Sequence, residues 1–129
     1  MELLRVWEEV ARELFIQGLS ISAHNKTKGE IYIRRAISTL YYGIFWYLKE
    51  FVEARGTKIK EYNAHVTLRE SLKAKGYEKA SQYLRELHLI RKNADYDKFP
   101  NTKLGYRNWK EAFEKAYKLF NLILKEVQR

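Results

Sequence analysis

The segment from about residue 28 to about residue 54 constrains the fold most strongly, because it predicts a helix that is apolar on most of its sides. Its apolar residues recur at steps of three and four, the spacing that holds side chains on one face of an α-helix. They are Ile31, Ala36, Ile37, Leu40, Tyr41, Ile44, Phe45, Leu48, Phe51 and Val52, with Tyr42, Trp46 and Tyr47 widening the stripe. Such a helix belongs at the centre of a bundle or on the contact face of an oligomer.

Local signals predict where this helix begins and ends. Thr27 and Glu30 stand three residues apart, which is the spacing of a capping box. Gly56 follows the last apolar residue, where a glycine in the left-handed conformation commonly ends a helix. We therefore expect the helix to start near residue 28 and to stop just before Gly56.

Four further segments show the same helical period, and no segment shows the alternation that is typical of a strand. The first carries Leu3, Leu4, Trp7, Val10, Ala11, Leu14 and Phe15 and is expected to end before Asn25. The others are predicted at about 61–74, about 78–96 and about 103–127, with Phe99 and Pro100 breaking the fourth helix. Short connections favour antiparallel neighbours. The prediction is an all-α fold, a single domain over residues 1–129, built as an up-and-down bundle of four to five antiparallel helices.

Several classes of function are excluded or disfavoured by what the sequence lacks. The chain contains no cysteine, which excludes disulfides, thiolate metal sites and cysteine nucleophiles. It has no glycine-rich phosphate loop, and His24, His65 and His88 are too far apart in sequence to predict a local metal site, so we expect no metal and no cofactor. No apolar run is long enough to span a membrane, and the first residues have the pattern of an amphipathic helix and not of a signal peptide. The absence of cysteine fits a protein of the reducing cytoplasm.

The charge of the chain points to its partners. The formal net charge is +9 at pH 7, and residues 1–28 carry none of this excess. A basic surface of this size favours polyanions such as RNA or the phosphates of nucleotides. A lysine-rich surface that only interacts with water is the alternative, and charge alone does not decide between the two.

One charged residue lies where the sequence predicts a buried one. The apolar stripe of the segment 78–96 runs through Ala80, Leu84 and Leu87 to Arg91 and Ala94, so Arg91 falls on the face that should be covered. A guanidinium there is costly unless a carboxylate or a ligand pairs with it. Asp95 lies one turn further and can pair with it. Arg91 therefore either binds a phosphate or carboxylate, or forms an ion pair with Asp95 that holds the helices together.

Three other positions are candidates for the same site. Tyr96 lies at the end of the helix, where its hydroxyl can donate to a phosphate or be modified. His65 stands beside an apolar stripe and is either a packing histidine or a polar group that points at Arg91. Ser38 precedes Tyr42 by one turn on the central helix, so the two can line one pocket, although core or interface packing explains Tyr42 equally well.

These residues, in this order, resemble the HEPN domain family of small helical bundles. The resemblance is to a prokaryotic branch with an Arg-x-x-Ala-Asp-Tyr signature, which is found here at residues 91–96. The central helix of that branch tends to contain Ser-Arg-x-Tyr-Tyr-x-x-Phe, matched here at residues 38–45 with Thr39 in place of arginine. A histidine of the following short helix matches His65. The three motifs span residues 38–97.

The resemblance implies a homodimer with a shared cleft around the arginine, where RNA or a nucleotide binds. That cleft would include Arg91, Asn93, Asp95, Tyr96 and Asp97, with Ser38 and Tyr42 from the central helix. Many members of the family are metal-independent ribonucleases, many serve as toxins paired with a small nucleotidyltransferase of the MNT type, and some carry a tyrosine that such a partner modifies with AMP.

The chain departs from the nuclease pattern of the family, which is Arg followed by four to six residues and then His. The positions available to that histidine are Tyr96, Asp97 and Lys98, so the usual acid-base group is missing. This leaves open whether the chain is an enzyme. Three hypotheses remain: a phosphate-binding half of a toxin–antitoxin or nucleotidyltransferase pair, a ribonuclease that acts through Arg91 with His65 or Tyr96, and a non-catalytic interaction module.

Overall fold

The computed structural model describes residues 2–96 and 108–128, and all the regular secondary structure in this part of the chain is helical. The helices are α1 (Glu2–Ser22), α2 (Lys26–Glu53), α3 (Ala64–Ala74), α4 (Glu78–Tyr96) and α5 (Trp109–Val127). The predicted all-α bundle is therefore confirmed. Within the described residues, no helix combines the length and the apolar character that crossing a bilayer would require.

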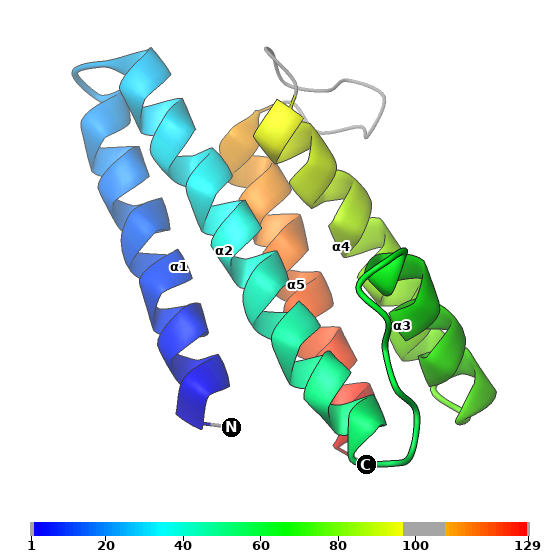
Figure 1. Cartoon of the computed structure of the whole chain (residues 1–129). Coiled ribbons are helices and arrows are strands. Elements are labelled where there is room, and N and C mark those ends of the chain that lie inside the picture. Colours follow the sequence, from blue (N-terminus) through cyan, green and yellow to red (C-terminus); the bar gives the residue numbers. More distant parts are fainter. Residues whose placement is uncertain (1, 97–107, 129) are drawn as a thin grey trace.

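The bundle is organised around α2, α4 and α5, which pack on one another (Figure 1). Helix α1 lies along the outer side of α2 and touches α5 over a short stretch only, and α3 packs mainly on α4. The connection over residues 54–63 turns back alongside α2, so that α3 begins partway up the bundle and then forms an antiparallel hairpin with α4. Residues of α2, α3 and α4 consequently meet on one side of the molecule.

Asparagines, and not the predicted capping box, start two of the helices. The side chain of Asn25 accepts a hydrogen bond from the backbone N–H of Lys28, so α2 begins at Lys26 and Thr27 lies inside it. Asn108 does the same for the N–H of Glu111, and α5 begins at Trp109, later than the predicted start near 103. Residues 103–107, like the predicted helix breakers at 99 and 100, lie outside the described residues.

Glycines set the ends of two helices and the distance between two others. Gly56 and Gly76 have φ angles of +95° and +92°, so the prediction of a left-handed residue after α2 is confirmed. Gly43 lets α1 approach α2 closely: a Cβ at this position would lie 2.6 Å from the Cβ of Trp7, too close for any real contact.

Several apolar residues that the stripes placed in the core lie at the surface. Leu3 and Val10 of α1 and Ile31 and Trp46 of α2 are exposed. The apolar stripes of these helices are wider than the surfaces that their neighbours cover, so the edges of the stripes stay in water. Trp46 follows Tyr42 by one turn on the uncovered side of α2.

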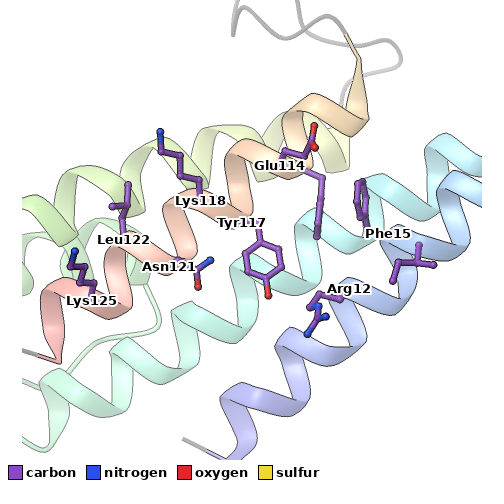
Figure 2. A pocket seen from close by; sticks show the side chains of 10 residues that line it. Arg12, Phe15, Glu114, Tyr117, Lys118, Asn121, Leu122 and Lys125 are labelled. Carbon is purple, nitrogen blue, oxygen red and sulfur yellow. The ribbon is translucent and has the colours of Figure 1, made fainter.

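A groove of about 690 Å³ separates α1 from α5 (Figure 2). The two helices meet where the rings of Phe15 and Phe113 stack with centroids 4.1 Å apart, and they spread apart from this contact toward Lys125. The hydroxyl of Tyr117 donates a hydrogen bond to the carboxylate of Glu8 across the gap. Sequence patterns did not predict this groove, because it depends on the angle between α1 and α5.

Candidate functional site

Arg91 is the charged residue that the fold buries most completely, among those the structure describes. Only 6% of its surface is exposed, on the same face of α4 as Leu84 and Leu87, as the stripe predicted. Its Nη2 donates a hydrogen bond of 2.7 Å to the hydroxyl of Tyr42. Its Nε lies 3.0 Å from Oδ2 of Asp95, an ion pair whose angles do not meet those of a hydrogen bond. Neither contact uses Nη1.

Aromatic rings surround the guanidinium. Its Cζ lies 5.0 Å from the ring centroid of Tyr42, 5.6 Å from that of Tyr41 and 5.8 Å from that of Tyr96. These distances allow cation–π attraction, which is strongest where water is excluded. Tyr96 is 73% exposed, so it marks the side on which the site opens to solvent.

The structure brings most of the predicted site residues together. Oγ of Ser38 donates a long hydrogen bond of 3.4 Å to Oδ2 of Asp95, which joins α2 to the end of α4. Asn93 lies on another face of α4, and its side-chain amide donates to the backbone carbonyl of Leu89. This hydrogen bond does not bring Asn93 to Arg91, so the predicted role of Asn93 in the site gains no support from it. Asp97 lies outside the described residues.

His65 reaches the site through Tyr41. The Tyr41 hydroxyl oxygen and Nδ1 of His65 are 2.5 Å apart. Tyr41 is completely buried, and this burial raises its pKa well above its usual value. The hydroxyl therefore stays protonated and donates a hydrogen bond to Nδ1 of His65. His65 is consequently the neutral tautomer with its proton on Nε2.

His88 is a member of the cluster that the sequence analysis did not single out. Its ring stacks on that of His65 with centroids 4.5 Å apart and an interplanar angle of 10°. Nη1 of Arg69 lies 3.2 Å from Nδ1 of His88, and since arginine can only donate, Nδ1 is the acceptor. The available signal was spacing: His88 precedes Arg91 by three residues and so shares its side of α4.

The cluster carries an excess of positive charge, and this charge contributes to the lowered pKa values of the two histidines. The pKa of His65 is lowered by burial and by the nearby Arg91 and Arg69. The pKa of His88 falls to about 4, through burial first, then His65, Arg69, Arg91 and Lys92. Asp95 is the carboxylate that contacts this group. A site of this composition suits an anion that would offset the remaining charge.

Comparison of the chain with protein-family models, curated proteins and solved structures finds no match. Two guanidiniums can hold an anion, and two neutral imidazoles can accept protons. Among the described residues, no three histidine, aspartate or glutamate side chains gather as a metal site would need.

Proposed function

We propose that the chain is a HEPN-like homodimer in the cytoplasm that binds a phosphate of RNA or of a nucleotide at the cluster of Arg91. The observation that carries this proposal is the grouping of Arg91 and Arg69 beside two neutral histidines, with Lys92 near His88 and Asp95 as the contacting carboxylate. Such an uncompensated positive charge is unfavourable in the free protein and becomes favourable when an anion binds.

The contacts support a division of labour within the site. Asp95 and Tyr42 hold the guanidinium of Arg91 from two sides, and Ser38 holds Asp95 in turn. Held in this way, Arg91 can present its remaining nitrogen to a phosphate without losing further side-chain entropy. Tyr96, exposed beside it, is placed to contact the ligand or to accept a nucleotide.

A strip along one side of α2 that ends in an exposed tryptophan supports the proposed dimer. Ser38, Tyr42 and Trp46 follow one another at intervals of four residues along α2, and Trp46 is 46% exposed. A two-fold contact on this strip would cover Trp46 and bring two copies of the Arg91 cluster together. Light scattering should show a dimer, and Trp46→Glu should give a folded monomer.

Binding of a labelled single-stranded RNA, measured by fluorescence anisotropy at low salt, tests the proposal. We expect Arg69→Ala and Arg91→Ala to weaken binding at least about tenfold, as the loss of a charge-assisted contact predicts. The matched control is Arg85→Ala, which removes an exposed arginine from α4, the helix that also carries Arg91. Equal weakening by Arg85→Ala, or no RNA binding by the folded protein, would contradict the proposal. The variants are compared only where circular dichroism shows native helicity.

The biological setting is part of the proposal. A small nucleotidyltransferase of the MNT type is the expected partner, as half of a toxin–antitoxin pair. Co-expression with the product of a neighbouring nucleotidyltransferase gene should give a stable complex. AMP transfer would add a mass of one AMP to the peptide that contains Tyr96 and not to its Tyr96→Phe variant.

Two alternatives have observations of their own. The contact of Tyr41 with His65 places an imidazole near Arg91 and so favours a ribonuclease. RNA cleavage in the presence of a chelator, lost in His65→Gln, would support it. The 6% exposure of Arg91, with Nε and Nη2 both engaged, favours a structural ion pair. RNA affinity that is unchanged in folded Arg91→Ala would support that alternative.

A further inference from the structure

The stacked imidazoles of His65 and His88 differ in what limits their protonation. Each has its proton on Nε2, because Nδ1 accepts from Tyr41 in His65 and from Arg69 in His88. A second proton would have to enter at Nδ1 in either ring.

The partner at Nδ1 decides which ring can take that proton. The partner of His88 is a guanidinium, which cannot accept a hydrogen bond, so a protonated His88 would face Arg69 with like charges and two opposed N–H groups. The partner of His65 is a hydroxyl, which can rotate and accept from Nδ1–H. His65 is therefore the member of the pair that can become charged, while neutral His88 stays stacked against it.

We propose that a phosphate bound beside Arg69 and Arg91 is bound together with one proton, and that His65 accepts this proton. The inference rests on the proposed phosphate site and adds to it a dependence on pH. The balance is simple: one proton leaves the solvent, a bond forms between it and Nδ1 of His65, and the hydrogen bond between His65 and Tyr41 reverses its direction.

The charges that face His65 explain why proton and phosphate should bind together. Helix α3 contributes Arg69 and α4 contributes Arg91, against Asp95 near the solvent side. Helix α2 contributes the hydroxyl groups of Tyr41 and Tyr42. In the free protein burial, followed by the charges of Arg91 and Arg69, lowers the pKa of His65. A phosphate between these groups reverses the sign of the local field and raises this pKa again.

Nuclear magnetic resonance with histidine labelled at its ring nitrogens tests the inference, with AMP as the probe. The pKa of His65 should rise when AMP saturates the protein. His24 is the internal control, because it lies exposed after the end of α1, and its resonance should follow pH identically with and without AMP. An unchanged titration of His65 in the AMP complex would overturn the proposal.

Affinity provides an independent measurement. The Kd of AMP should decrease as the pH falls from about 8 to about 6.5, by up to about tenfold per unit, because each complex takes up one proton. Calorimetry in two buffers that differ in ionisation enthalpy should show this uptake directly, without any variant. In His65→Gln the uptake should disappear, whereas His24→Gln should retain it.

The outcomes separate this inference from the proposed function. If AMP binds through Arg91 and Arg69 without proton uptake, the phosphate site stands and the role of His65 is wrong. If uptake persists in His65→Gln, another group takes the proton and the inference is again wrong. If neither AMP nor 5′-phosphorylated RNA binds at any pH, both proposals are overturned.

Discussion

Arg91 of α4 donates a hydrogen bond of 2.7 Å to the hydroxyl of Tyr42 of α2, so the arginine that lies on a buried stripe is held by the helix opposite. We expect Tyr42→Phe to lower the free energy of unfolding by about 1–3 kcal/mol, because a nearly buried guanidinium nitrogen loses its acceptor. Urea denaturation measures this difference.

Tyr47→Phe is the matched control, since Tyr47 is also partly buried on α2 and its hydroxyl forms no hydrogen bond with a described residue. An equal loss of stability in both variants would show that the hydrogen bond with Arg91 contributes nothing specific.

The lowered pKa of His88 predicts how stability depends on pH. As the pH falls below 6.5, the ordinary pKa of histidine, His88 of the unfolded chain takes up a proton. In the folded protein His88 is protonated only near pH 4, because its pKa is lowered to about 4. The unfolded state therefore gains protons first, and the free energy of unfolding falls over this window. In His88→Gln this fall should be shallower, since no proton is taken up at that position.

Denaturation at a series of pH values between 7 and 4 measures the slope for the unmodified protein and for His88→Gln. Superimposable profiles of His88→Gln and the unmodified protein would contradict the assignment of this slope to His88.

Gly43→Ala should destabilise the protein by about 1–3 kcal/mol, because the new methyl group would meet Trp7 at 2.6 Å and α1 would have to move away from α2. The second variant of the test is Trp7→Gly, which removes the Cβ that the new methyl group would meet. The loss in the double variant should be smaller than the sum of the two single losses. Strict additivity would mean that the methyl group is accommodated without a clash.

The hydrogen bond from Tyr117 to Glu8 joins α1 to α5 and shifts both groups. Burial, together with the Glu8 carboxylate, raises the pKa of Tyr117 to about 12. Burial alone would raise the pKa of Glu8, but the hydrogen bonds of Tyr117 and Arg5 outweigh it and the pKa is lowered. Tyr117→Phe should therefore raise the pKa of Glu8 and reduce stability by about 1–2 kcal/mol.

A double-mutant cycle with Glu8→Gln checks this contact, because two partners in one hydrogen bond should show a coupling of at least about 0.5 kcal/mol. The pKa of Glu8, followed by carbon-detected resonance of its carboxyl group, gives a second measurement. A pKa of Glu8 that does not change in Tyr117→Phe would contradict the prediction.

The sequence predicted the helices well because their signal is periodic and local. Helix α4 occupies the predicted 78–96, and its apolar stripe correctly placed Arg91 on the buried face, where one of the two predicted alternatives, the ion pair with Asp95, is found. The start of α2 was wrong because Asn25 outcompetes Thr27 as a cap, and a spacing rule cannot rank two neighbouring caps.

The remainder of the site depends on how the helices are placed, which spacing does not reveal. Nothing in the sequence pairs Tyr41 with His65 or stacks His65 on His88, since those contacts join three helices. The exposed Leu3 and Trp46 were predicted to be buried for the same reason: a stripe indicates which face is apolar and not how much of it a neighbour covers.

The contacts between helices in the candidate site also determine when it can form. The hydrogen bonds from Tyr41 to His65, Arg91 to Tyr42 and Ser38 to Asp95 join α2 to α3 or α4 and connect residues that are 24, 49 and 57 positions apart. The pairs α1–α2 and α3–α4, by contrast, are hairpins of consecutive helices that can associate early on the folding pathway. The cluster around Arg91 is assembled only when these hairpins dock, so a chain with its helices formed but not yet docked would have no place for a phosphate.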